Sequence, residues 1–284
     1  MKIESLYDPK TFTLTYIVYD ENSKDAIIID PVLDYDPKSS TVSFENFELH
    51  KKFIEDKSLT LHYILETHAH ADHLSSSQYL KEAFPNAKIG IGENIKTVQQ
   101  VFKGFFNYES LKTDGSQFDH LFQDGEVFHA GSLEVKVINT PGHTPACVSY
   151  LIHDAVFTGD SLFIEDYGTG RCDFPGGNSK DCYVSIHDKL YDLPDETRVF
   201  VGHDYQPEGR ELRCQTTIGI SKKENVMLKA DTSEDEFVSR RNSRDSSLAA
   251  PVLLLPSVQV NINAGKFPPA ENNEVSYLKL PIRF

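Results

Sequence analysis

One short segment of the chain concentrates side chains that bind metal ions. In "THAHADH", Thr67 to His73, three histidines and an aspartate stand within six positions: His68, His70, Asp72 and His73. His68 and His70 are two residues apart, so an extended backbone projects both imidazoles to the same side. Burying several imidazoles and a carboxylate without partners is costly, and a metal ion satisfies them together. The segment therefore predicts a metal site.

Three further candidate ligands follow in turns or at the ends of expected strands. His143 lies in "TPGHTPA", where prolines and a glycine fix the loop, Asp160 ends the strand in "VFTGDSLF", and His203 ends the strand in "VFVGHDY". Taken singly, they are equally well explained as a turn histidine, an aspartate that caps a helix and a surface histidine. Their order after the first motif makes a specific pattern.

This pattern, HxHxDH followed by "PGHT", "TGD" and "GHD", resembles the metallo-β-lactamase superfamily over most of the chain. The resemblance implies an α/β fold, a four-layer αββα sandwich with its metal site on one rim of the paired sheets. It also implies a complete two-metal set, with His68, His70 and His143 on one ion, Asp72, His73 and His203 on the other, and Asp160 bridging.

Other segments resemble one group within the superfamily, the persulfide dioxygenases related to the ethylmalonic encephalopathy protein and its bacterial β-lactamase-like relatives. These segments are "YGTGRCDFPGG", "HDY" and the C-terminal "LLLPSVQVNINAGKFPP". The group implies one Fe(II) per chain, held by His68, His143 and Asp160. Two histidines and one carboxylate leave coordination positions open for substrate sulfur and dioxygen. The remaining residues, His70, Asp72, His73 and His203, would orient the ligands or hold water.

The implied reaction oxidises glutathione persulfide with dioxygen to sulfite and releases glutathione. The resemblance places Arg171 at a glutathione carboxylate and Tyr205 at the peptide, although a solvated arginine and a half-buried tyrosine are the plain alternatives. Where many relatives carry RTDF, this chain has Cys172 as the second residue. We expect an inert thiol there; a persulfide relay and oxidation during turnover are the alternatives.

Two other functions compete with this interpretation. A glyoxalase II-type thioester hydrolase uses the same seven ligand positions with two zinc ions, and a metal-bound hydroxide attacks the thioester. The C-terminal third of the chain, which lacks an obvious counterpart of the hydrolase's helical substrate domain, weighs against it. A non-catalytic persulfide or metal sensor is the second alternative, but the ligand set is not degraded.

The elements that must position these residues alternate between strands and helices. An opening hairpin and repeated strands that end in polar residues favour layered sheets over a helical bundle or a barrel. We expect strands at 12–20, 25–32, 59–67, 88–92 and 197–205, three more within 133–163, helices at 43–58, 76–87 and 179–194, a helix beginning at 221, and a charged helix followed by a Pro-bounded extended stretch within 234–269.

Composition narrows the class of protein. The chain has 284 residues, which we divide into a catalytic domain (1–230) and a C-terminal extension packed on it (231–284). The formal charge of −15 argues against nucleic acid as a partner. The sequence has no apolar run long enough for a bilayer and no secretory signal at its start, so we expect no membrane partner and a cytoplasmic location. The four cysteines are expected to be reduced, the "SRRNSR" run (239–244) to be a solvated helix face, and a homodimer is left open.

Overall fold

β2 (Thr13–Tyr19) needs a layer of structure on each side. Successive side chains of a strand point to opposite faces, and every residue of β2 is buried. Leu14 and Val18 belong to the core between the two large sheets, whereas Ile17 and Tyr19 belong to a second core beneath helices. A sheet covered by a second sheet on one face and by helices on the other is the natural result.

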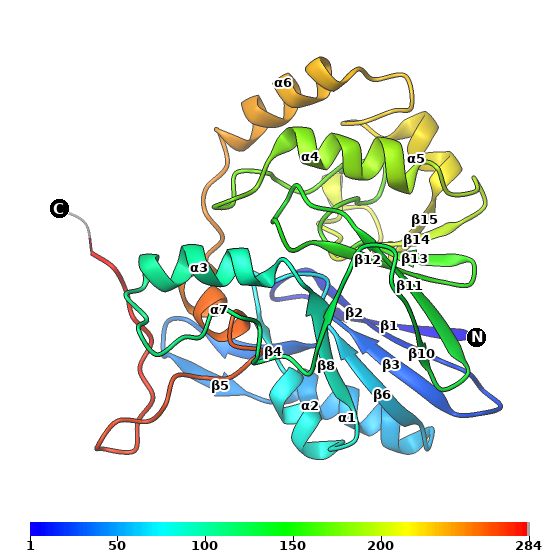
Figure 1. Ribbon diagram of the computed structural model, residues 1–284. Coiled ribbons are helices and arrows are strands. Elements are labelled where there is room, and N and C mark those ends of the chain that lie inside the picture. Colours follow the sequence, from blue (N-terminus) through cyan, green and yellow to red (C-terminus); the bar gives the residue numbers. More distant parts are fainter. Residues whose placement is uncertain (283–284) are drawn as a thin grey trace.

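The structure is a computed structural model that describes residues 1–282, and its strands form two large sheets and one small one (Figure 1). The first large sheet has the order β1 (Lys2–Asp8), β2, β3 (Asp25–Ile29), β6 (Thr60–Leu65), β8 (Lys88–Gly92), β9 (His120–Phe122). The second has the order β10 (Val127–Ala130), β11 (Leu133–Asn139), β12 (Val148–Ile152), β13 (Ala155–Phe157), β14 (Arg198–Phe200), β15 (Gln215–Thr217). The small sheet has the order β5 (Thr41–Ser43), β4 (Val32–Asp36), β7 (Leu74–Ser75).

Helices cover the outer faces of the paired sheets, and this confirms the predicted αββα sandwich (Figure 1). On the side of the first sheet lie α1 (Glu45–Asp56), α2 (Ser77–Ala83), α3 (Ile95–Phe105) and α7 (Leu254–Asn261). On the side of the second sheet lie α4 (Ser179–Tyr183) with its π-helical continuation (Val184–Leu190), α5 (Ile218–Glu224) and α6 (Glu234–Asp245). A short 3₁₀ turn spans Pro207–Gly209.

Two sequence predictions fail within the C-terminal third. The Pro-bounded stretch expected to be extended contains α7, because Pro256 stands in the first turn, where the missing N–H would have no intrahelical partner. The helix expected to begin at Ser221 begins at Ile218, where the Thr217 hydroxyl accepts a hydrogen bond from the Ile220 N–H, and it ends at Glu224.

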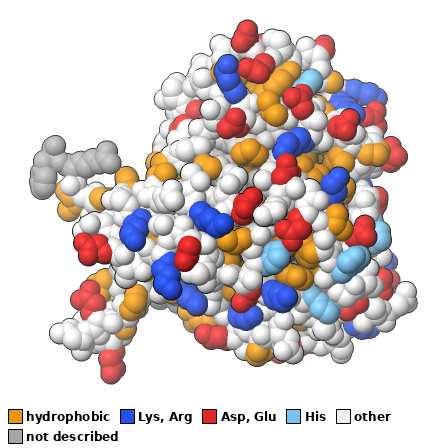
Figure 2. Space-filling model, in the orientation of Figure 1, with side chains coloured by type: hydrophobic (Ala, Val, Ile, Leu, Met, Phe, Trp, Pro, Cys, Tyr) orange, Lys and Arg blue, Asp and Glu red, His pale blue; other side chains and the backbone are white. Residues whose placement is uncertain are grey.

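The C-terminal helices are closely attached to the sandwich. α6 packs on α4, and α7 packs on β7. The domain boundary proposed at residue 230 stays a prediction. Within residues 1–282 no helix has both the length and the apolar character needed to cross a membrane. Figure 2 shows acidic and basic side chains interspersed over the face that it presents.

Candidate metal centre

The seven candidate ligands come from loops that meet at one rim of the two sheets. The loop that carries His68 follows β6, and His143 lies between β11 and β12. Asp160 and His203 follow β13 and β14, which are parallel, so both side chains leave the sheet at the same edge. The Tyr150 hydroxyl donates to the Glu66 carbonyl (2.8 Å). This bond connects the second sheet to the start of the loop from Glu66 to His73, which we call the metal loop.

A glycine allows the "TGD" loop to approach the metal loop. Gly159 has a φ of +49°, and a Cβ there would lie 2.3 Å from the Thr67 hydroxyl oxygen. Both the left-handed backbone and the lack of space exclude larger residues. Asp160 is thereby placed beside the histidines.

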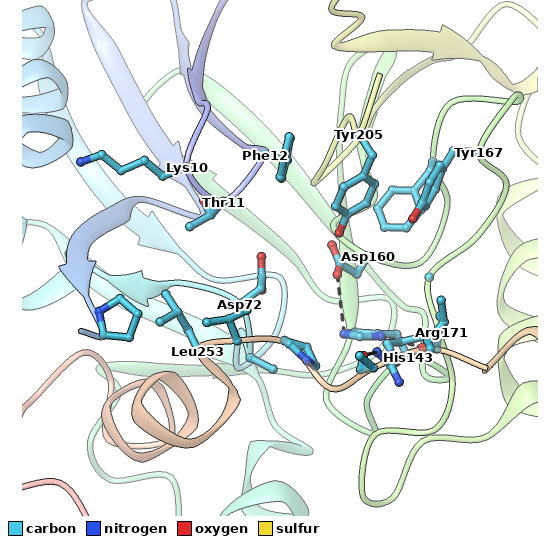
Figure 3. Close-up of a pocket in the computed structure, with 18 of the residues that line it drawn as sticks. Lys10, Thr11, Phe12, Asp72, His143, Asp160, Tyr167, Arg171, Tyr205 and Leu253 are labelled. Carbon is cyan, nitrogen blue, oxygen red and sulfur yellow. Dashed lines mark hydrogen bonds and ion pairs between the residues drawn. The ribbon is translucent and has the colours of Figure 1, made fainter. Parts of the chain in front are cut away.

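His68, His143 and Asp160 form the first group of candidate ligands. All three are buried, and each offers one nitrogen or oxygen atom within 4.8 Å of the others. The His143 Nε2 lies 3.6 Å from the Asp160 Oδ2 (Figure 3). The structure thus brings together the three residues that the sequence assigns to a single iron.

The remaining four candidates lie directly beside this group. His70, Asp72 and His73 form a second group within 4.8 Å. The His203 Nε2 lies 3.0 Å from the Asp72 Oδ2 and 3.3 Å from the Asp160 Oδ1. Asp160 therefore faces His143 with one carboxylate oxygen and His203 with the other, as a bridging ligand would.

Hydrogen bonds fix which ring nitrogen faces the centre in three of the histidines, His68, His73 and His143. The Thr67 hydroxyl donates to Asp30 (2.8 Å), so it accepts the Nδ1–H of His68 (3.0 Å). His73 and His143 donate Nδ1–H to the carbonyls of Leu74 (2.9 Å) and Arg171 (2.7 Å). Outer partners of this kind fix the tautomer of metal-binding histidines, and here they leave Nε2 without a proton.

The groups that face the centre fit a metal ion. Buried atoms without a hydrogen-bond or ion-pair partner among residues 1–282 include His68 Nε2, His70 Nδ1 and His73 Nε2. Asp72 Oδ2 and Asp160 Oδ1 have the His203 Nε2 as their neighbour. Clustered imidazole nitrogens without a partner are rare in a folded protein, and a bound ion would satisfy all three together. Imidazole and carboxylate together suit iron or zinc.

Burial and nearby charges act differently on the histidines. Burial lowers the pKa of His68 well below its usual value and that of His73 to about 4. For His203, burial acts downward, but Asp160 and Asp72 outweigh it and raise the pKa to about 9. His70 is buried too, yet Asp30 and Glu66 raise its pKa well above the usual value. An ion held by His68 thus meets an unprotonated imidazole, whereas an ion bound through His70 or His203 would displace a proton.

A cavity of about 700 Å³ opens onto the first group (Figure 3). Both predicted substrate residues, Arg171 and Tyr205, line it together with His143 and Asp160. Burial, helped by Asp160 and Asp72, raises the pKa of Tyr205 well above its usual value, so its hydroxyl keeps its proton. Other parts of its wall, which the sequence did not indicate, come from Lys10, Phe12, Tyr35, Tyr167, Arg244 and Val252.

The guanidinium of Arg171 already has partners. It donates to both carboxylate oxygens of Asp173 (2.6 and 2.7 Å) and to the Ala249 carbonyl (2.7 Å). The planar fork is therefore held in one orientation at the cavity wall. A substrate carboxylate would share this cation with Asp173.

The "SRRNSR" run was expected to be solvated, and this is wrong for Arg241, which is 2% exposed. Its guanidinium donates to Asp245 (3.0 Å to Nε) and to the Thr169 carbonyl (3.0 Å). Asp245 in turn accepts the Cys172 N–H (2.8 Å). The Arg/Asp spacing of four residues is equally typical of an exposed helix, so no local pattern indicates this anchor for the loop that carries Arg171.

The Cys172 thiol points into the core. Its contact with the Cys182 thiol and its burial raise its pKa well above the usual value. Because the thiolate is the reactive form, this environment supports the expectation that Cys172 is inert.

Comparisons with known proteins agree with the fold and the ligand pattern. The model of the metallo-beta-lactamase superfamily matches residues 9–203. The chain belongs to this superfamily.

Two relatives and one solved structure show which members of the superfamily this chain is similar to. Glyoxylase B2 of Dictyostelium discoideum is 47% identical over all of this chain and 97% of its own length. The mitochondrial persulfide dioxygenase ETHE1 of Homo sapiens is 31% identical over 79% of this chain and 80% of its own length. The crystal structure of ETHE1 from Myxococcus xanthus has a TM-score of 0.76 at 31% identity, over 94% of this chain and 100% of that one.

Proposed function

We propose that this protein is a persulfide dioxygenase that holds one Fe(II) through His68, His143 and Asp160. The observation that carries the proposal is the group of two histidines and one carboxylate, with ligand atoms within 4.8 Å, at a cavity lined by Arg171 and Tyr205. The likeness to the two ETHE1 proteins supports it. A metal cofactor of some kind is supported independently by the superfamily and by the ligand clusters.

The proposed substrates are glutathione persulfide, dioxygen and water, and the products are glutathione, sulfite and two protons. The S–S bond of the persulfide breaks, its terminal sulfur is oxidised and dioxygen is reduced. Iron(II) supplies the one-electron chemistry that dioxygen requires and open positions for substrate.

The residues of the chain bind and orient the substrate. Arg171, fixed by Asp173, provides a cation for a carboxylate of the tripeptide. Lys10 and Arg244 add positive charge to the cavity wall. Tyr205 keeps its hydroxyl proton and can donate it in a hydrogen bond to a peptide carbonyl. The Nδ1–H bonds of His68 and His143 hold their Nε2 lone pairs towards the centre.

A dinuclear thioester hydrolase is the second candidate, because the second ligand group lies beside the first and Glyoxylase B2 is 47% identical. In that arrangement His70 would share one ion with His68 and His143, and His203 would hold the other, so filling both sites displaces a proton from each of these two histidines.

Two parallel assays separate the candidates. An oxygen electrode should record dioxygen consumption with glutathione persulfide and none with glutathione alone. S-Lactoylglutathione should be hydrolysed slowly or not at all. Rapid thioester hydrolysis without persulfide-dependent oxygen uptake would overturn the proposal in favour of the hydrolase.

A further inference from the structure

Asn261, at the end of α7, forms hydrogen bonds to the main chain of the metal loop and the residues after it through both the NH₂ group and the oxygen of its side-chain amide. Its Nδ2 donates to the carbonyls of His70 and His73, each at 2.8 Å. Its Oδ1 accepts the Ser75 N–H at 2.9 Å. Asn261 is separated from these residues by more than 180 positions in the sequence and lies outside the segment that matches the family model.

The Asn261 amide and the three main-chain groups that it binds, together called the clamp, are buried. The amide fits these groups in one orientation only. Asn261 is 5% exposed, and His70, His73 and Ser75 are buried as well. Turning the amide by half a rotation would set its oxygen against two carbonyls and its NH₂ against an N–H, so only the described orientation satisfies all three groups. An unsatisfied buried main-chain group is strongly disfavoured.

The helix that carries Asn261 is itself firmly seated. Val258 and Ile262 are fully buried. The Gln99 side chain donates to the Ile262 carbonyl (2.9 Å), and the Gln78 side chain donates to the Ala264 carbonyl (2.7 Å). α7 thus presents Asn261 from a fixed base.

The loop from Glu66 to His73 has no regular secondary structure, so the directions of its side chains depend on such contacts. Asn261 fixes the carbonyls at both ends of the segment 70–73, which carries the whole second ligand group. We propose that Asn261 is a positioning residue, which sets the placement of His70, Asp72 and His73 and thereby makes metal affinity depend on α7.

The inference rests on the proposed metal site but not on the metal's identity or the reaction. Loss of an outer partner of a metal ligand typically lowers metal affinity about 10- to 100-fold, and this range applies here to an ion that His70, Asp72 or His73 helps to hold. We expect an effect of this size when the amide is removed, although Asn261 touches no metal.

The test compares two amides of α7 that each make three hydrogen bonds. Gln259, also buried, bonds the Leu255 carbonyl and both main-chain groups of Lys279, none of which belongs to the metal loop. Asn261→Leu and Gln259→Leu therefore remove matched sets of bonds. Co²⁺ is titrated into each metal-free protein and followed by its visible absorption, and thermal unfolding is measured in parallel.

We expect Asn261→Leu to bind Co²⁺ about 10- to 100-fold more weakly with an altered spectrum, and Gln259→Leu to bind as the wild type does even if its Tm falls equally. Equal affinity in Asn261→Leu and wild type would overturn the inference. If Asn261→Leu does not fold, the same measurements are made on Asn261→Asp and judged by the same criteria. This variant keeps the acceptor for the Ser75 N–H but loses both donors. A wild type that binds no Co²⁺ would overturn the metal site itself and the inference with it.

Discussion

Removing the carboxylate of Asp245 should destabilise the protein far more than its place on a charged helix suggests. Arg241 and Asp245 are 2% and 4% exposed, and the guanidinium donates to Asp245 through Nε and Nη2. In Asp245→Ala the buried cation keeps only its contacts with Thr169, and the Cys172 N–H loses its acceptor. Breaking a buried ion pair from one side typically lowers stability by about 3–5 kcal/mol. We expect a loss of this size, a large part of the ~5–15 kcal/mol that stabilises a domain.

Urea unfolding of the metal-free protein measures this loss. The matched control is Glu236→Ala, which removes the partner of Arg240 in an exposed pair with the same four-residue spacing on the same helix. Exposed pairs contribute about 0.3–0.5 kcal/mol, so the control should be nearly neutral. If Asp245→Ala and Glu236→Ala lose similar amounts, below about 1 kcal/mol, then Arg241 is not a buried anchor and the account of the Arg171 loop is wrong.

Three further predictions concern the site and its surroundings. His143→Ala or Asp160→Ala should lose bound metal and activity together, because each removes one of three ligands; elemental analysis with full metal content would contradict this. Arg171→Ala should mainly raise the KM for glutathione persulfide, since the residue lines the cavity without joining the ligand group, and an unchanged KM would refute its placement. Burial lowers the pKa of His50 to about 3 from 6.5, so in acid the unfolded chain takes up a proton that the folded protein excludes. His50 therefore leaves the free energy of unfolding unchanged above pH 6.5 and lowers it as the pH falls towards 3, by about 2 kcal/mol at pH 5. Urea unfolding of wild type and His50→Gln at pH 8 and pH 5 should show that difference, and a pH-independent difference would contradict the burial argument.

The gathering of the candidate ligands at one rim could be predicted, in part from local chemistry and in part from the resemblance to the superfamily. The clustered histidines of the first motif need partners whatever the fold, and strand ends bring polar residues to one rim. The hairpin of β2 and β3 likewise could be predicted from a short-range sequence pattern. The two strands pair antiparallel, as a hairpin requires. Long-range contacts were required to bring His143, Asp160 and His203 to the first motif.

What the sequence did not reveal depends on tertiary contacts. The burial of Arg241 is decided by the Thr169 carbonyl, 72 residues away, and by a carboxylate four residues along its own helix. α7 forms despite Pro256 because its position in the first turn is tolerated and buried neighbours seat the helix. The clamp of Asn261 on the metal loop joins positions that no local pattern connects.

We propose above that the group of His68, His143 and Asp160 holds a single iron. Elemental analysis of anaerobically purified protein tests it most directly, because the two leading functions differ in metal identity and number. We expect about one iron per chain and little zinc. About two zinc ions per chain, filling both ligand groups, would contradict it.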